Sequence, residues 1–455
     1  MVNRGMIESR HSETEHAEMI RTIGIASAEQ LFADVPKPLR FPSLDLPEPL
    51  AEADLARELR GQARRNTPIE DRPCFLGAGS YRHFIPATVD YVLQRGEFYT
   101  AYTPYQPELS QGMLQAMFEY QSMICQLTGM EVSNASHYDG ATSLAEAILL
   151  ALDATGDARD RIVMSPAVHP HYREVATTYL QGTNAEILVP DDPAIAASGL
   201  LPFVDSSTAA VVVQNPNFFG LSEQIDGLAQ VVHGLGALLI VVSDPIALGL
   251  FQPPGAYGAD VVVADGQPLG LPPNFGGPSL GIFATRREHI RRLVGRVVGE
   301  TADTEGRRGY VLTLATREQH IRRERATSNI CTNSALGALA AAVYLATLGK
   351  PGLREVAELC FNKSHYAAKQ ISAIPKVKVN ANAQGRDFFK EFVIELTRPA
   401  RDVNAILLED HEIIGGYDLG GSFPGHENQM LLAVTELNTR AEIDNLVHAL
   451  AGVVS

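Results

Sequence analysis

Short apolar runs recur through the middle of the chain, and stretches with helical periodicity separate them. Most of these runs are apolar at every position, which is typical of strands that are covered on both faces. Helices between successive strands favour a mostly parallel sheet in an α/β domain. The predicted strands are 161–164, 186–189, 209–214, 237–242, 260–264 and 280–284.

The two ends of the chain have different patterns. Residues 1–70 show polar helical patterns that the proline-rich stretch "FPSLDLPEPL" interrupts, which predicts an N-terminal helical arm. After residue 330, a small-residue helix over 334–349 should end at Gly349 and Pro351. A helix over 353–371 and strands at 376–380, 391–396 and 430–434 then predict a smaller α+β domain. We therefore expect an arm (1–70), a large α/β domain (71–330) and a C-terminal part (331–455).

Composition narrows the classes of partner. The chain of 455 residues has a formal net charge of −16, which argues against nucleic acid as a partner. The apolar runs are short and interrupted, so we expect no membrane span. None of the four cysteines forms a C-x-x-C pair, which favours a reduced, cytoplasmic protein without a structural metal site. They are Cys74, Cys125, Cys331 and Cys360.

Polar groups follow several predicted strands, where parallel sheets bind ligands. Gly140 and Thr142 stand at a helix start that could hold an anion, or simply an N-cap. Asn215 and Asn217 flank a proline after one strand and could face a ligand or form a turn. Asp244 follows the next strand and could pair with a ring nitrogen or cap a turn.

The order of these features resembles fold-type I pyridoxal-phosphate enzymes, the aspartate aminotransferase superfamily. The resemblance implies that the helix start holds the phosphate and that the aspartate pairs with the pyridine nitrogen. A lysine after the following strand would form the Schiff base. That position lies in "ADGQPLGLPPNFGGPSLG" (264–281), and no lysine occurs between Lys37 and Lys350. A Schiff base needs a primary amine, so the expected loop cannot form one.

Four stretches resemble the glycine cleavage system P-protein family. They are "YTAYTPYQPELSQG" (99–112), "NASHYDGATSLAEA" (134–147), the glycine-rich loop above and "TREQHIRRERATSNICT" (316–332). The resemblance covers nearly the whole chain. The family has two homologous halves, fused or as separate α and β subunits, and one half carries a His-Lys-Thr-Phe motif that binds the cofactor. Gln267 falls at the lysine position, so the resemblance implies the α subunit.

The resemblance also implies partners and a reaction. A β subunit would carry pyridoxal phosphate, decarboxylate glycine and pass the aminomethyl group to the lipoyl arm of H-protein, in an α2β2 assembly. This chain would hold no cofactor covalently and would be inactive alone. The vestigial pocket positions would be Gly140, Thr142, Asn215, Asn217, Asp244 and Gln267.

Residues 99–108 are the best candidates for a contribution to the partner's active site. Pro104 and Pro107 prevent a regular helix or a central strand and favour a stiff loop. Its polar groups could reach across an interface, or its tyrosines could serve only as a structural contact. The candidates are Tyr99, Tyr102, Tyr105, Gln106 and Glu108.

Other features and readings stay open. The basic cluster within 317–325 could meet an acidic partner, although a salt-bridged hinge segment is the favoured interpretation. His169 and His171 are interpreted as part of a turn rather than as metal ligands. A pseudoenzyme scaffold for a pyridoxal-phosphate-dependent partner is an alternative function. A stand-alone pyridoxal-phosphate enzyme is a third, against which the lysine gap argues.

Overall fold

The computed structural model describes residues 11–43, 45–100, 102–156, 159–274, 277–326, 328, 330, 332–381, 383 and 385–454. Cys331 lies outside these residues. The chain divides into two compact units, Met1–Asp71 and Arg72–Ser455. The candidate site lies in the second unit.

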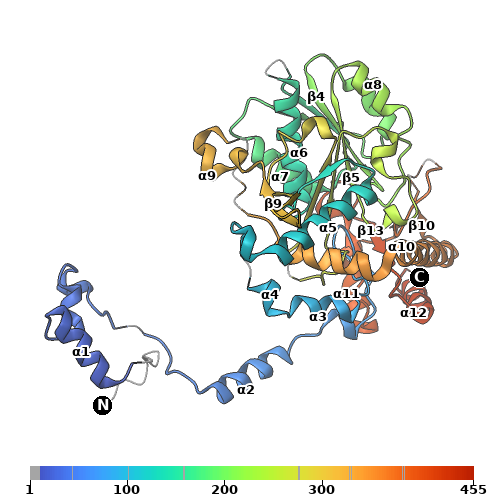
Figure 1. Ribbon diagram of the computed structural model, residues 1–455. Coiled ribbons are helices and arrows are strands. Elements are labelled where there is room, and N and C mark those ends of the chain that lie inside the picture. Colours follow the sequence, from blue (N-terminus) through green and yellow to red (C-terminus); the bar gives the residue numbers. More distant parts are fainter. Residues whose placement is uncertain are drawn as a thin grey trace. The chain divides into compact units, whose positions relative to one another are not determined.

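The first unit is built from short helices. Helix α1 (Glu13–Ile23) begins with a capping box between Ser12 and Glu15, and helix α2 (Glu52–Ala63) follows the proline-rich stretch (Figure 1). Three 3-10 turns, η1 (Ala28–Phe32), η2 (Lys37–Leu39) and η3 (Ile69–Asp71), complete it. No described residue between 11 and 71 is buried, so this unit has no core of its own.

The second unit contains a seven-stranded sheet in the order β1-β7-β6-β5-β4-β2-β3. Strands β3, β2, β4, β5 and β6 are parallel, whereas β7 and β1 are antiparallel to their neighbours. All six predicted strands are present, and the expected mostly parallel α/β fold is confirmed. The strands are β1 (Val132–Ser133), β2 (Arg161–Met164), β3 (Glu186–Leu188), β4 (Thr208–Asn215), β5 (Leu238–Ser243), β6 (Val261–Asp265) and β7 (Gly281–Thr285).

Helices cover both faces of this sheet, as the continuous apolar runs predicted. Along β4, Val211 and Val213 join one core cluster, while Ala210 and Val212 join the other. One face packs against α6 and α7, and the opposite face packs against α5, α8 and α10 (Figure 1). The α-helices of this part are α3 (Ala87–Leu93), α4 (Gly96–Tyr99), α5 (Gln111–Thr128), α6 (Gly140–Thr155), α7 (Pro170–Leu180), α8 (Leu228–Gly234), α9 (Gln319–Arg322) and α10 (Ala335–Ile371).

The seven-stranded sheet and the helices that cover it form the large lobe of the second unit. Two further strands complete this lobe. Strands β8 (Val297–Ala302) and β9 (Arg308–Thr313) form an antiparallel hairpin that sequence analysis did not identify. The connections contain short 3-10 turns. These are η4 (Pro107–Leu109), η5 (Ala197–Phe203), η6 (Ala247–Gly249), η7 (Pro254–Tyr257), η8 (Arg287–His289), η9 (Ala315–Arg317) and η10 (Arg323–Arg325).

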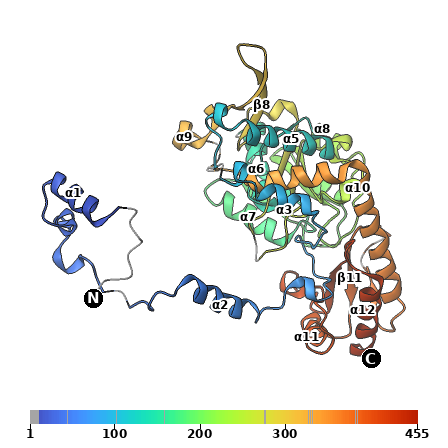
Figure 2. The ribbon, with the colours of Figure 1, turned by 60° about the horizontal axis from the view of Figure 1, so that its bottom comes forward.

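Helix α10 leads from the large lobe into the C-terminal part, where it lies beside α12 (Figure 2). It breaks at Gly349 (φ 60°), where the small-residue helix was predicted to end. Among the described helices it alone is long and apolar enough to cross a bilayer by length and composition. Its segment Gly337–Ala342 packs in the core of the large lobe, so we assign it as a core helix.

The small lobe is an antiparallel sheet in the order β10-β11-β13-β12, packed against α11, α12 and the end of α10. The Phe75 side chain packs in the core of the small lobe, and its amide donates a hydrogen bond to the Ile414 carbonyl. The chain therefore enters the small lobe before it crosses to the large lobe. The elements are β10 (Lys378–Val379), β11 (Glu391–Glu395), α11 (Ala400–His411), β12 (Tyr417–Asp418), η11 (Leu419–Gly421), β13 (Gln429–Ala433) and α12 (Arg440–Val453).

Candidate functional site

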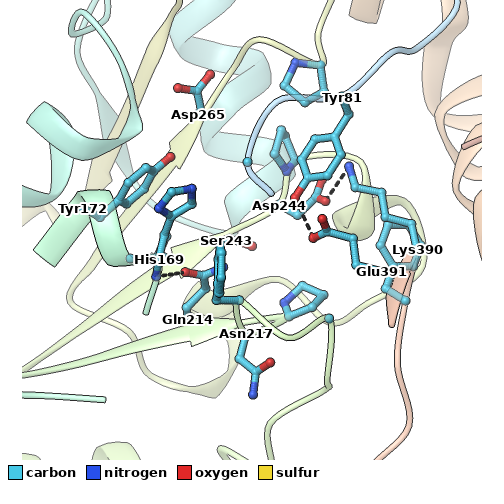
Figure 3. Close-up of a pocket in the computed structure, with 18 residues that line it drawn as sticks. Tyr81, His169, Tyr172, Gln214, Asn217, Ser243, Asp244, Asp265, Lys390 and Glu391 are labelled. Carbon is cyan, nitrogen blue, oxygen red and sulfur yellow. Dashed lines mark hydrogen bonds and ion pairs between the residues drawn. The ribbon is translucent and has the colours of Figure 1, made fainter. Parts of the chain in front are cut away.

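A cavity of about 40 Å³ lies where the carboxyl ends of β4, β5 and β6 meet the small lobe (Figure 3). Typical small-molecule sites measure roughly 300–1,000 Å³. Side chains from both lobes line the cavity at the strand ends. They include Tyr81, His169, Tyr172, Asn217, Asp244 and Lys390.

Asp244 forms a buried ion pair with a lysine from the small lobe. Its Oδ2 atom lies 2.7 Å from Nζ of Lys390, and its Oδ1 accepts a bond from the Ile246 amide (Figure 3). Lys390 immediately precedes β11 and is only 1% exposed. The aspartate therefore caps the turn after β5, as the simpler interpretation held, and also binds a cation.

The start of α6 binds an internal carboxylate. Asp139 is the N-cap and shares a capping box with Thr142, which supports the plain-cap interpretation. The Gly140 amide donates to Oδ2 of Asp265 at 3.1 Å. Burial raises the pKa of Asp265. Hydrogen bonds from the Ser279 hydroxyl and from the backbone amides of Gln267 and Gly140 oppose that rise.

Gln267, at the expected lysine position, uses its whole side-chain amide to hold another segment. Its Oε1 accepts the Tyr81 amide at 2.9 Å, and its Nε2 donates to the Tyr81 carbonyl at 2.9 Å. Nε2 also donates to the Leu271 carbonyl at 2.6 Å. Because these backbone contacts occupy its oxygen and both amide hydrogens, Gln267 has a structural role here.

The two asparagines at the carboxyl end of β4 shape a turn. Oδ1 of Asn215 accepts the Glu223 amide at 3.1 Å. Oδ1 of Asn217 accepts two backbone amides, those of Phe219 and Leu221, and its Nδ2 donates to Oε1 of Glu223 at 2.7 Å. The turn interpretation holds for both residues, although Asn217 also lines the cavity.

Sequence analysis missed three aromatic residues of the site. The rings of His169 and Tyr172 stack at 4.8 Å, and burial lowers the pKa of His169 to about 4. His169 also contacts the Ala78 carbonyl at 2.9 Å and is the N-cap of α7, and His171 lies inside that helix, so the turn predicted for the two histidines is in fact a helix start. The third, Tyr81, places its ring 3.4 Å from Nζ of Lys390. No local pattern assigned these three residues to the strand-end cavity, because each reaches it only through the tertiary fold.

Glu391 joins the loop over the cavity to the small lobe. Its Oε1 accepts the Ala78 amide at 2.7 Å, and its Oε2 accepts the Tyr81 hydroxyl at 2.8 Å. Burial raises the pKa of Glu391 to about 7, and these two bonds with the charge of Lys390 oppose the rise. It was not among the residues that the sequence singled out.

The tyrosine-rich candidates form a separate surface segment. Tyr99 ends α4, Glu108 lies in η4, and residues 102–106 are neither helix nor strand. Tyr102 is 78% exposed, and the Tyr105 hydroxyl accepts a bond from Arg296 at 2.9 Å. None of the described residues of this segment lines the cavity, and its proposed role stays a prediction.

Thr142 faces a second, larger cavity of about 330 Å³ rather than the strand-end cavity. His137 and Glu146 also line this second cavity, and Ser328 donates a hydrogen bond to Glu146. Burial raises the pKa of Glu146 to about 7. The six predicted pocket positions therefore do not form one cluster: Asn217 and Asp244 line the first cavity, and Gly140 reaches it through Asp265.

The strand-end cavity does not fit pyridoxal phosphate. The cavity is too small for the cofactor, the expected pyridine partner is bound to Lys390, and the expected phosphate position is bound to Asp265. In the loop that should supply the Schiff base, Gln267 stands instead of lysine and is bound to Tyr81. We therefore derive no cofactor chemistry for this cavity.

Comparison with known proteins places the chain in a family. The model of the glycine cleavage system P-protein matches residues 8–450. A "Probable glycine dehydrogenase (decarboxylating) subunit 1" of Thermomicrobium roseum is 52% identical over 448 residues, which make up 98% of this chain and 99% of that protein. A protein of the same name from Geobacillus kaustophilus is 50% identical over 442 residues, 96% of this chain and 97% of that protein.

Solved structures agree with these matches. A crystal structure of glycine decarboxylase (P-protein) of the glycine cleavage system, in inhibitor-bound form, matches with a TM-score of 0.90. It is 46% identical and covers 98% of this chain and 100% of that one. A sphingosine-1-phosphate lyase of Burkholderia pseudomallei matches with a TM-score of 0.64 at 18% identity over 92% of this chain and 95% of that one, which shows the fold alone. The expected fold-type I architecture is confirmed, and the chain belongs to the glycine cleavage system P-protein family.

Proposed function

We propose that this chain is the cofactor-free α subunit of a heteromeric glycine decarboxylase. One observation carries this choice within the family: Gln267 stands at the lysine position, and the Tyr81 backbone binds its amide. A β subunit would supply pyridoxal phosphate, which serves as the electron sink when glycine loses CO2. The aminomethyl group then passes to the lipoyl arm of H-protein. We expect an α2β2 assembly in the cytoplasm.

The N-terminal unit supports a partner subunit. None of the described residues between 11 and 71 is buried, yet the unit carries many large apolar side chains. Folded proteins rarely leave such a set uncovered, so we infer that it packs against another surface and propose that a partner subunit provides that surface. The most exposed are Ile23, Leu31, Leu39, Phe41 and Leu46.

The function is tested by purifying the chain alone and with its lysine-bearing partner. The visible spectrum and glycine–bicarbonate exchange are then recorded for each preparation. We expect no aldimine absorbance and no exchange in the isolated chain, and both in the assembled enzyme. Aldimine absorbance in the isolated chain would contradict the cofactor-free assignment.

The same experiment separates the alternative of a non-catalytic scaffold. If the partner alone catalyses exchange at the full rate of the complex, this chain is only a scaffold. If exchange appears only after assembly, the chain contributes to catalysis or to the active conformation of its partner. The tyrosine-rich segment is the first place to look for such a contribution.

We propose that Tyr102 and Tyr105 belong to the surface that meets the partner's active site. Tyr102 is 78% exposed and Tyr105 is 57% exposed, so both rings lie on the surface, and Arg296 donates a hydrogen bond to the Tyr105 hydroxyl. Replacing Tyr102 by Phe and Tyr105 by Phe should lower the exchange rate of the complex by about 10-fold or more, because a placed hydroxyl in acid–base chemistry contributes about 10²–10⁴-fold.

Tyr91→Phe is the matched control, since Tyr91 is also exposed but lies outside this segment. Exchange rates and assembly, measured by sedimentation, would be compared with those of the wild type. Unchanged exchange and unchanged assembly in both segment variants would show that the assignment is wrong. A loss of assembly without a change in the residual rate per complex would leave the segment a structural contact only.

A further inference from the structure

We propose that the chain fills its own cofactor pocket with two charged side chains that replace the ends of the cofactor. Lys390 takes the place of the pyridinium beside Asp244, and Asp265 takes the place of the phosphate at the start of α6. This inference rests on the proposed function, because it explains how a P-protein subunit without the lysine keeps a folded, closed site.

At the end of the pocket where the pyridinium would lie, Asp244 and Lys390 form a complete ion pair. Asp244 lies at the end of β5, where a buried carboxylate without a partner would strongly destabilise the fold. In a loaded fold-type I enzyme the pyridinium is that partner, and here the partner is Nζ of Lys390 at 2.7 Å. Tyr81 lies against the same ammonium group at 3.4 Å, which adds a cation–π contact. A second cation has no place beside Asp244 while Lys390 is present.

At the other end of the pocket, where the phosphate would lie, the start of α6 already has an anionic partner. Free amides and the dipole at a helix start favour a negative group, which is why phosphates bind there. Here the Gly140 amide donates to the Asp265 carboxylate at 3.1 Å, and Ser279 donates to the same side chain at 2.6 Å. The Tyr172 hydroxyl lies so close that a Cβ atom on Gly140 would meet it at 2.0 Å. A phosphate would have to displace both Asp265 and Tyr172.

A segment of the chain closes the pocket between these two ends. Tyr81 is bound to Gln267 of the large lobe through its backbone and to Glu391 of the small lobe through its hydroxyl. Gly79 approaches His169 so closely that a Cβ atom there would meet the ring at 2.8 Å. The closing segment is thus held from both lobes, and the position of the missing lysine provides one of its anchors.

Behind Lys390, a buried histidine extends the network. Nδ1 of His83 lies 2.7 Å from Glu436, and Nε2 lies 3.3 Å from Nζ of Lys390. Burial and the charge of Lys390 lower the pKa of His83, which favours a neutral ring that donates through Nδ1 and accepts through Nε2. Cys360 lies beside Glu436, and His83, Cys360 and Glu436 together could surround a metal ion. Both ring nitrogens of His83 already have partners, so we assign these three residues to the hydrogen-bond network behind Lys390 instead.

The test measures binding of pyridoxamine 5′-phosphate, which has no aldehyde and therefore needs no lysine. The full chain and its variants would be titrated by fluorescence and equilibrium dialysis. The double variant Lys390→Ala with Asp265→Ser should bind at least about tenfold more tightly than the wild type, since it frees two charge-assisted contacts. Each single variant should fall between the two. The control Lys378→Ala removes an exposed lysine and should bind as the wild type does.

Circular dichroism and urea unfolding would establish that the double variant is folded. A folded double variant that binds no more tightly than the wild type would overturn the proposal. Failure here would leave the proposed function standing, because exchange by the assembled wild-type enzyme is a separate measurement.

A second measurement uses only the wild-type chain and so does not depend on variant folding. Pyridoxal phosphate and borohydride would trap any lysine that reacts with the aldehyde, and mass spectrometry would locate it. We expect labels on exposed lysines such as Lys378 and none on Lys390. A label on Lys390 at stoichiometric cofactor would show that the pocket opens to the cofactor and would overturn the proposal.

Discussion

Replacing Gly220 by Ala is expected to destabilise the protein by about 2–5 kcal/mol. Gly220 has a φ of 81°, where a side chain costs about 1–2 kcal/mol. A Cβ atom would also meet the carbonyl oxygen of Glu391 at 1.9 Å and its carbonyl carbon at 2.5 Å. Because these are backbone atoms, the chain must shift, and forced shifts of a packed core typically cost about 1–3 kcal/mol more.

Gly306→Ala is the matched control for this substitution. Gly306 has nearly the same φ, 80°, but no atom lies within 4 Å of its hypothetical Cβ. Its cost should be limited to the backbone penalty of about 1–2 kcal/mol. Urea unfolding of the two variants would compare these losses of unfolding free energy, and equal losses would contradict a steric role for Gly220.

The close approach at Gly220 positions the candidate site. The Gly220 carbonyl accepts the Phe389 amide at 3.1 Å, and Leu221 forms an isolated bridge with Phe388. The turn after β4 is thereby fixed against the segment that leads into β11 and carries Lys390. A shift here would move the lysine away from Asp244, so the Gly220 variant should also disturb the ion pair.

Most strands of the large lobe were predictable because their runs are apolar at nearly every position. A run such as 209–214 needs cover on both faces, and only a sheet between helices supplies it. Strand β1 has only two residues, too few for any periodic pattern to appear. The hairpin β8–β9 was missed because the outer end of β8, residues 299–302, reads Gly-Glu-Thr-Ala and shows no alternation of apolar and polar positions.

The site was only partly predictable. Asp244 and Gly140 could be found because the end of a strand and the start of a helix are marked by local patterns. Lys390 could not, because it reaches the site from another sheet, and a lysine in a sequence normally indicates solvent exposure. The loop after β6, where the resemblance places the amine, has no lysine, whereas the fold brings the amine of Lys390 from the small lobe for a different purpose.

Lys390→Met should destabilise the protein by about 3–5 kcal/mol, because it leaves the Asp244 carboxylate buried without its partner. Methionine keeps the length and apolar stem of lysine, so loss of packing contributes little. Adding Asp244→Asn removes the uncompensated charge and should recover a large part of the loss. Urea unfolding of both single variants and the double variant gives the coupling energy directly.

Lys378→Met is the control, since Lys378 forms an ion pair of the same 2.7 Å length with Glu395 within the same sheet. The Lys378 side chain is 66% exposed, and removal of an exposed pair typically changes stability by about 1 kcal/mol or less. The two pairs match in chemistry and length and differ mainly in burial. A large difference between the two variants would therefore measure the cost of a bare carboxylate at the pyridinium position, and equal losses would show that Lys390 does not compensate it.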